Sequence, residues 1–253
     1  MSHARIVIHS DVASLQADAA ARFAEAAARA ATGRRRFDAV LTGGSTVPAV
    51  YERLAAEPLS SSIDWSLVHV WWTDERCVPP DDPRSNYGAA RKALLDRVAI
   101  PCEQIHRMRG EDPNPEREAV RYEAMLRREQ GLARAEAPRF DFAFLGLGSD
   151  AHVASLFPGA PTLGFADRLV AAVGPDEAPI PDPSVGRLTL TFPALNAVRA
   201  VVFVVAGEGK TDAVRAVLEE PRDPSLRPAQ GIHPAAAEPV WLLDRAAAAG
   251  LAR

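Results

Sequence analysis

An aspartate and a histidine two residues apart could carry out proton transfer. Asp150 and His152 stand in the segment GLGSDAHVASLFP, directly after the apolar run Phe140–Leu145. A neutral imidazole, with an ordinary pKa of about 6.5, can take a proton from water at neutral pH, and a nearby carboxylate can orient its ring. We therefore predict that His152 is a general base oriented by Asp150. The alternative is a loop histidine with a structural role only.

The glycines of this segment superficially fit the dinucleotide-binding pattern G-x-G-x-x-A. We exclude that interpretation because Asp150 would face the pyrophosphate and Pro158 leaves no room for a long following helix. The chain also contains no G-x-S-x-G motif, which would mark a serine nucleophile.

A second cluster could bind an anion. Gly43, Gly44, Ser45 and Thr46 lie between an expected strand, Phe37–Leu41, and an expected helix near residues 47–56. Glycines allow the backbone to approach a ligand closely, hydroxyl groups add donors, and a helix N-terminus favours negative charge. These residues are predicted to cradle a phosphate, although an ordinary tight turn with a capping hydroxyl would look the same.

Two further clusters place charges after strands. The expected strand Leu67–Thr73 leads directly into the charged residues Asp74, Glu75 and Arg76, and Asn86 lies further along the chain. We expect Arg76 to face a carbonyl or an anion, with a carboxylate orienting it; the alternative is the start of a solvated loop.

The second of these clusters combines Arg187 with Lys210, and Lys210 lies in the stretch GEGKT. This stretch is not a P-loop, because Val204 stands where the required glycine should be. Only two of the 29 basic residues, Lys92 and Lys210, are lysines, which weakly favours a specific role for Lys210 at a helix N-terminus. The other histidines lack such a context, and neither histidines nor Cys77 and Cys102 have zinc-binding spacing, so we expect no metal.

The elements that position these clusters alternate between strands and helices. Such alternation predicts an α/β fold with a mainly parallel central sheet and helices on both faces, in one domain spanning residues 1–253. Ligands bind such sheets beyond the carboxyl ends of the strands, where all four clusters stand. The expected strands are Arg5–His9, Phe37–Leu41, Leu67–Thr73, Phe140–Leu145, Leu188–Phe192, Ala200–Ala206 and Val240–Leu243. The expected helices cover 11–31, 47–56, 86–98, 116–130 and 209–220, with an alanine-rich helical tail. The proline-rich stretches 79–83 and 174–184 are expected to be loops over the site.

Composition limits the partners. Among 253 residues, 47% are hydrophobic and 25% charged, and the net charge is -4. This balance provides no basic excess for nucleic acid. No apolar run reaches the roughly 18 residues of a membrane span, and the N-terminus lacks the apolar stretch of a signal peptide. We expect a cytoplasmic protein.

Five segments resemble, in the same order, those of the 6-phosphogluconolactonases. They are LTGGSTVPAVYERLA, VWWTDERCVPPDDPRSNYGAARKALL, FDFAFLGLGSDAHVASLFPG, RLTLTFPALNAVRAVVFVVAGEGKTDAV and WLLDRAAA, across roughly residues 39–249. The resemblance implies a modified Rossmann-like fold. It also implies hydrolysis of 6-phospho-D-glucono-1,5-lactone to 6-phosphogluconate in the oxidative pentose phosphate pathway, with no metal or organic cofactor. We expect a monomer or a weak homodimer.

The resemblance also assigns roles to residues. The catalytic histidine and its aspartate fall on His152 and Asp150. For the oxyanion, our own expectation is stabilisation by Arg76 or by the backbone N–H groups of residues 148–151. The substrate and phosphate groups fall on Gly43, Gly44, Ser45, Thr46, Asp74, Glu75, Asn86, Arg187 and Lys210.

The chain departs from the family pattern at two positions. Ala151 replaces a usual glycine between the aspartate and the histidine, and Val47 comes before the proline that usually follows GGST directly. A positive φ at Ala151 would cost on the order of 1 kcal/mol, so we expect a negative φ there.

Two other functions remain as alternatives. Glucosamine-6-phosphate deaminases share similar loops but usually carry a glutamate after the histidine, in A-F-N-E-P, where this chain has ASLFP at residues 154–158. A non-catalytic sugar-phosphate sensor would carry a DNA-binding helix-turn-helix ahead of the domain, and the first strand, expected from Arg5, leaves no room for one.

Overall fold

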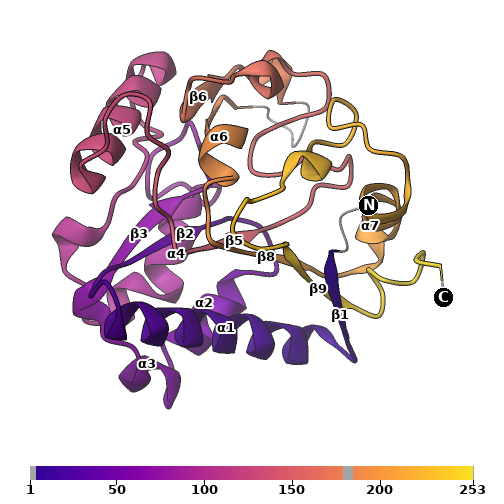
Figure 1. Ribbon diagram of the computed structural model, residues 1–253, viewed down its shortest axis with the longest axis horizontal. Coiled ribbons are helices and arrows are strands. Elements are labelled where there is room, and N and C mark those ends of the chain that lie inside the picture. Colours follow the sequence, from indigo (N-terminus) through magenta and orange to yellow (C-terminus); the bar gives the residue numbers. More distant parts are fainter. Residues whose placement is uncertain (1–3, 179–184, 253) are drawn as a thin grey trace.

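A six-stranded sheet forms the centre of the molecule (Figure 1). The computed structural model describes residues 4–178 and 185–252. All pairs in this sheet are parallel, and the strand order is β1-β9-β8-β5-β2-β3. The strands are β1 (Arg5–His9), β2 (Phe37–Leu41), β3 (Val68–Trp72), β5 (Phe142–Leu145), β8 (Ala200–Val205) and β9 (Val240–Asp244). The chain runs outward from β2 to β3 in one direction and from β5 to β8 and β9 in the other. The carboxyl ends of β2 and β5 therefore flank the point where the topology reverses, which is the expected place for a ligand.

Helices cover both faces of this sheet, as predicted from the sequence. The helices are α1 (Val12–Thr32), α2 (Pro48–Leu54), α3 (Leu59–Ser62), α4 (Asn86–Ala93), α5 (Pro115–Gln130), α6 (Phe192–Leu195) and α7 (Thr211–Glu219). In Figure 1, α1, α2 and α3 lie on one side of the sheet and α5 and α6 on the other. Alternate side chains of each strand enter opposite cores: Phe142 and Phe144 pack with α1, whereas Ala143 and Leu145 pack with α5.

Local sequence accounts for the longest helix. Asp11 caps α1 by accepting the N–H of Ser14 at 2.7 Å, and the helix buries Leu15 and Phe23 together with small alanines. The Phe23 ring packs edge-on against Phe37 and Phe142, which fixes α1 across the sheet.

The structure also contains a second, three-stranded sheet that the sequence analysis did not predict. It is antiparallel, in the order β4 (Asp74–Arg76), β7 (Arg187–Leu190), β6 (Val170–Val173). Residues 74–76 are therefore a strand and not the start of a loop. Hydrogen bonds extend the pairing just beyond them, from Leu190 N–H to Thr73 C=O and from Cys77 N–H to Gly186 C=O. Because all these partners are distant in sequence, local patterns do not reveal them.

Several element ends differ from the expectations. Strand β7 stops at Leu190, because Pro193 lies in the first turn of α6. Helix α4 ends at Ala93, before a short 3-10 turn. The alanine-rich tail after β9 forms turns and not a helix, and the carboxylate of Asp244 accepts the N–H of Ala247 at its start.

Two expectations concern loops and membranes. The stretch 79–83 is a loop, and the expected loop at 174–184 lies partly outside the described residues. Within residues 4–178 and 185–252, no helix has the length and apolar character needed to cross a membrane.

Candidate functional site

A cavity of about 150 Å³ lies where the carboxyl ends of β2 and β5 meet the second sheet. The residues lining it are Thr42, Gly43, Gly44, Asp74, Arg76, Asn86, Gly146, Leu147, Gly148, His152, Ala154, Arg187 and Lys210. A smaller hollow of about 70 Å³ shares Gly43, Gly44 and Lys210 with it and adds Ser45 and Thr46. The structure therefore brings together four segments that the sequence places more than 160 residues apart at their extremes. Of the predicted site residues, Glu75 and Asp150 do not line either hollow.

Asp150 holds the histidine ring by one of its nitrogens. The Nδ1–H of His152 donates to Oδ1 of Asp150 at 2.5 Å, and the ring lies against Phe157 with centroids 4.6 Å apart. Burial raises the pKa of Asp150, but the hydrogen bond and charge of His152 outweigh burial, so the pKa lies below its usual 3.8. An ionised carboxylate can only accept, so the proton of the neutral ring lies on Nδ1. Nε2 is then the nitrogen that can accept a proton in the cavity.

The backbone around His152 is tightly constrained. The N–H of Gly148 donates to the carbonyl of His152 at 2.9 Å, and a Cβ on Gly148 would lie 2.0 Å from Nδ1 of the ring. Only glycine fits there. The expectation of a negative φ at Ala151 is wrong: its φ is +66°, and Ala154 has a φ of +51°. Ala151 therefore adopts the left-handed conformation that glycine tolerates more easily, which costs on the order of 1 kcal/mol of stability.

The glycine turn after β2 is fixed from the core side and open on the cavity side. The hydroxyl of Tyr51 donates to the carbonyl of Thr42 at 2.8 Å and accepts its N–H at 3.0 Å. A Cβ on Gly43 would lie 1.9 Å from Oδ1 of Asn86, so this position has to be glycine. Gly44 has a φ of +106° and faces open space. The turn thus presents backbone close to the cavity, as the predicted phosphate cradle requires.

Two arginines reach the cavity from the second sheet. Arg76 and Arg187 are directly opposite each other in the antiparallel β4–β7 pair. Nη1 of Arg76 donates to the carbonyl of Arg84 at 2.6 Å. Burial lowers the pKa of Arg187, the charge of Asp74 opposes that shift, and the charge of Arg76 adds to it. Two guanidinium groups from the second sheet therefore line this wall of the cavity.

Lys210 brings a third cation from the other side. It precedes α7, in a short turn that begins at Gly207, whose φ is +97°. The carboxylate of Asp244 accepts the Gly207 N–H at 3.1 Å and thereby fixes the turn. Burial lowers the pKa of the Lys210 ammonium, and the charge of Asp150 opposes this shift.

Glu75 faces away from the cavity and anchors a helix. Its carboxylate accepts the backbone N–H groups of Asn86 at 2.7 Å, Tyr87 at 2.8 Å and Arg76 at 2.8 Å, as well as the hydroxyl of Ser85. Burial raises the pKa of Glu75, and these hydrogen bonds oppose the shift. Ser85 is the N-cap residue of α4, and Glu75 accepts the next two N–H groups of this helix end. The carboxylate therefore holds Asn86 and Arg76 beside the cavity.

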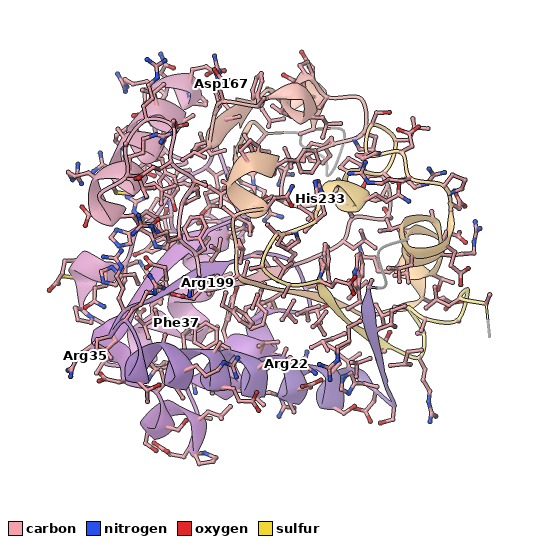
Figure 2. The ribbon with its side chains drawn as sticks, viewed as in Figure 1. Arg22, Arg35, Phe37, Asp167, Arg199 and His233 are labelled. Carbon is pink, nitrogen blue, oxygen red and sulfur yellow. The ribbon has the colours of Figure 1, made fainter. Side chains whose placement is uncertain are left out.

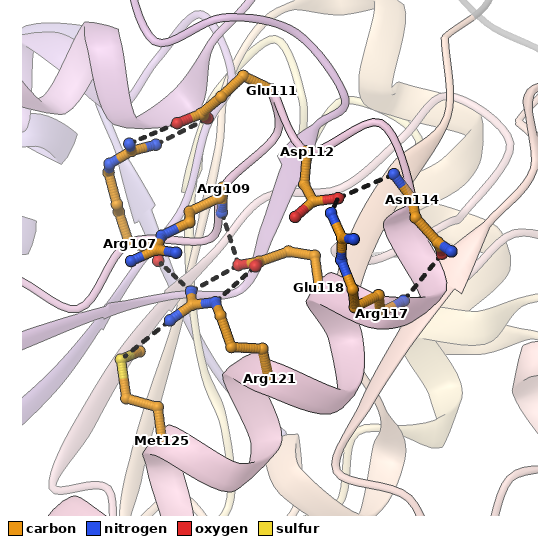
Figure 3. Close-up of polar contacts among 9 residues, drawn as sticks. All are labelled: Arg107, Arg109, Glu111, Asp112, Asn114, Arg117, Glu118, Arg121 and Met125. Carbon is orange, nitrogen blue, oxygen red and sulfur yellow. Dashed lines mark hydrogen bonds and ion pairs between the residues drawn. The ribbon is translucent and has the colours of Figure 1, made fainter.

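An ion-pair network around Glu118 holds the segment that packs against β4; Figure 3 shows its polar contacts. The buried carboxylate of Glu118 accepts the Arg109 N–H at 2.8 Å and is paired with Arg121 at 2.5 Å. The next residue after Arg109, Gly110, packs under β4, where a Cβ would lie 2.1 Å from the carbonyl oxygen of Arg76. Sequence reasoning did not detect this support, which combines a buried glutamate with a glycine eight residues earlier.

The other histidines among the described residues, His9, His69, His106 and His233, do not line either hollow. His233, labelled in Figure 2, forms a hydrogen bond between its Nδ1 and the carbonyl of Gly231. Nδ1 of His69 and Nε2 of His106 lie 3.0 Å apart. No group of three or more metal-binding side chains is assembled within the part of the chain that the structure describes.

Comparisons with known proteins agree with this geometry. The family described as "Glucosamine-6-phosphate isomerases/6-phosphogluconolactonase" matches residues 10–241. A 6-phosphogluconolactonase of Nostoc sp. is 43% identical over 216 residues, which cover 85% of each chain. One from Mycobacterium tuberculosis is 40% identical over 250 residues, 97% of this chain and 98% of that one.

A solved structure gives the same result for the fold. The crystal structure of the 6-phosphogluconolactonase from Thermotoga maritima superposes with a TM-score of 0.79 at 28% identity, covering 95% of this chain and 99% of that one. These matches confirm the resemblance that the sequence motifs indicated. The chain belongs to the family of glucosamine-6-phosphate isomerases and 6-phosphogluconolactonases.

Proposed function

We propose that this protein hydrolyses 6-phospho-D-glucono-1,5-lactone to 6-phosphogluconate in the oxidative pentose phosphate pathway. The observation that carries the proposal is the pairing of His152 with Asp150 in a cavity that also holds Arg76, Arg187 and Lys210. This site offers a proton acceptor and a group of cations, which are the two features that a phosphorylated lactone requires. The relatives named as 6-phosphogluconolactonases support the same substrate.

The reaction begins with proton transfer from water. Nε2 of neutral His152 takes a proton from a water molecule as its oxygen attacks C1 of the lactone. The carbonyl π electrons move to the carbonyl oxygen, and a tetrahedral oxyanion forms. When the oxyanion collapses, the bond from C1 to the ring oxygen breaks, and the imidazolium returns its proton to that oxygen. His152 ends neutral, and the product is the open-chain acid.

The cations have two separate tasks. A donor beside C1 stabilises the oxyanion, which is worth roughly 3–4 kcal/mol in comparable sites. We assign this task to Arg76, which lines the cavity, because the N–H groups of Gly148 and Ala151 already donate to the carbonyls of His152 and Gly148. Arg187, Lys210 and the Gly43–Thr46 turn bind the phosphate, which is remote from the reacting carbon. Phosphate binding orients the lactone so that C1 faces His152.

Hydrolysis of freshly generated 6-phosphogluconolactone, measured above its spontaneous rate, tests the proposal. We expect turnover by the wild type, and about 10²- to 10⁴-fold less by His152→Ala. His233→Ala, a histidine outside the cavity, should keep the wild-type rate and serves as the control. Because every step uses side chains and water, activity should survive a chelator. Ammonia release from glucosamine 6-phosphate would favour a deaminase, and a His152→Ala protein with the parent rate would falsify the assigned base.

A further inference from the structure

Ser155, a buried residue of the loop that carries His152, makes two hydrogen bonds to the second sheet. Its hydroxyl donates to Oδ2 of Asp74 at 2.7 Å, and its N–H donates to Oγ1 of Thr189 at 3.2 Å. Ser155 and Thr189 are both completely buried. Asp74 and Thr189 are themselves directly opposite each other in the β4–β7 pair. One cross-strand pair therefore holds both polar groups of Ser155.

The same two strands carry the arginines one step further along. Arg76 follows Asp74 by two residues on β4, and Arg187 precedes Thr189 by two on β7. Side chains two residues apart on a strand share a face. The pair Asp74–Thr189, which holds Ser155, therefore lies next to the pair Arg76–Arg187 on the same face of the second sheet.

The loop needs such an attachment because its own backbone is strained. Ala151 and Ala154 are both left-handed, with φ of +66° and +51°, and they flank His152. Left-handed alanines persist only where the surroundings enforce them. At Ala151 this enforcement includes a bond from the N–H of Ala229 to its carbonyl at 3.0 Å. Directly after Ala154, the two hydrogen bonds of Ser155 hold the backbone in place.

We propose that Ser155 and Thr189 are positioning residues, which fix the distance between the His152 ring and the arginine pair. The expected effect on catalysis rests on the proposed function, whereas the expected effect on the position of the His152 ring does not. The hydroxyl of Ser155 touches no reacting atom. It acts through Asp74 and Thr189, and through the loop, on where Nε2 of His152 lies.

Three variants test this role. Ser155→Ala removes the hydroxyl donor, and Thr189→Val removes the acceptor of the backbone N–H. Thr191→Val is the matched control, because Thr191 is a buried threonine directly after β7, but its hydroxyl donates to the carbonyl of Arg168 and not to the loop of His152. If Ser155→Ala does not fold, Thr189→Val tests the same attachment.

Kinetics give the first measurement. We expect kcat for 6-phosphogluconolactone to fall about 10- to 100-fold in Ser155→Ala and Thr189→Val, because small displacements of a catalytic group have effects of this size. KM should stay within about threefold, since the arginines remain in place, and Thr191→Val should match the wild type. A rise in KM with unchanged kcat would overturn the proposal, because Ser155 would then act on binding.

Nuclear magnetic resonance of ¹⁵N-labelled histidine gives a second measurement that needs no turnover. The His152 ring, assigned by comparison with His152→Ala, should give one sharp set of signals in the wild type and in Thr191→Val. In Ser155→Ala and Thr189→Val these signals should broaden or double through exchange on the microsecond to millisecond timescale. Unchanged His152 signals in both variants would overturn the proposal. A wild type without lactonase activity would instead overturn the proposed function and leave this test valid.

Discussion

Arg76 and Arg187 lie directly opposite each other across two antiparallel strands, and both line the same cavity. Like charges in directly opposed positions destabilise a sheet. A bound anion between them would convert this repulsion into attraction, so the pair is well suited to hold a phosphate or a developing oxyanion. Lys210, from the turn before α7, adds a third positive charge on the other side of the cavity.

The first prediction concerns these cations. Arg187→Ala and Lys210→Ala should each raise KM for the lactone about 10- to 100-fold, which corresponds to the loss of one charge-assisted contact. The fall in kcat should be smaller, because the phosphate is bound in both the ground state and the transition state. Steady-state kinetics measure both constants. Arg199→Ala, an exposed arginine at the amino end of β8 (Figure 2), is the control. A loss confined to kcat would place these cations at the transition state instead.

A second prediction tests the role of the carboxylate at Asp150. In Asp150→Asn, the side-chain amide can donate to Nδ1 of His152, which would place the ring proton on Nε2. A ring protonated there cannot accept a proton from water, so kcat should fall roughly 10²- to 10⁴-fold with little change in folding. Asp167, labelled in Figure 2, is exposed and lines neither hollow of the site, so Asp167→Asn should leave kcat unchanged. Near-wild-type turnover by Asp150→Asn would show that tautomer control is not what Asp150 provides.

Much of the fold and of the cavity could be predicted from sequence, because the signals involved are local. Apolar runs ending in glycine or charged clusters identified β2 and β5 together with the residues that follow them. Gly43, Gly44 and His152 were identified in the same way, since close backbone approach and proton transfer limit the residue types that can serve.

Other features depend on contacts between distant segments. Asp74–Arg76 is a strand only because β7, more than 100 residues later, pairs with it. Glu75 was predicted as a site residue because it belongs to the charged cluster Asp74–Arg76, yet alternation along the strand turns its side chain towards the start of α4. Ser155 gave no signal, because its importance comes from Asp74 and Thr189. The positive φ of Ala151 could not be read from an alanine, which usually avoids that conformation.

The third prediction uses that strained alanine. Ala151→Gly should stabilise the protein by up to about 1 kcal/mol, because glycine adopts the left-handed conformation freely, although its greater freedom in the unfolded chain offsets part of the gain. For a chain of this size, such a gain raises Tm by about 2–4 °C. Ala28→Gly, at an exposed position within α1, should lower Tm instead. Equal decreases in both variants would mean that Ala151 carries no strain.

The fourth prediction concerns the pair formed by His106 and His69, which lies near the amino end of β3. The ring of His106 stacks on Trp71 with centroids 4.0 Å apart, and its Nε2 contacts Nδ1 of His69. Burial lowers the pKa of His106 from 6.5 to about 4, and the charges of His69 and Arg36 add to this effect, while Glu129 and Asp38 oppose it. The folded state therefore binds fewer protons than the unfolded state between these two values.

The free energy of unfolding must therefore rise with pH between about 4 and 6.5. The contribution of His106 is complete above pH 6.5 and is lost as the pH falls towards 4, with an upper limit of roughly 3 kcal/mol. Denaturant unfolding of the wild type at several pH values between 4 and 7 should show this loss. His106→Phe keeps an aromatic ring on Trp71 but cannot take up a proton, so its free energy of unfolding should depend less steeply on pH. His69 contacts His106, so the difference between the two curves reports the titration of this histidine pair. Parallel curves would contradict the assignment.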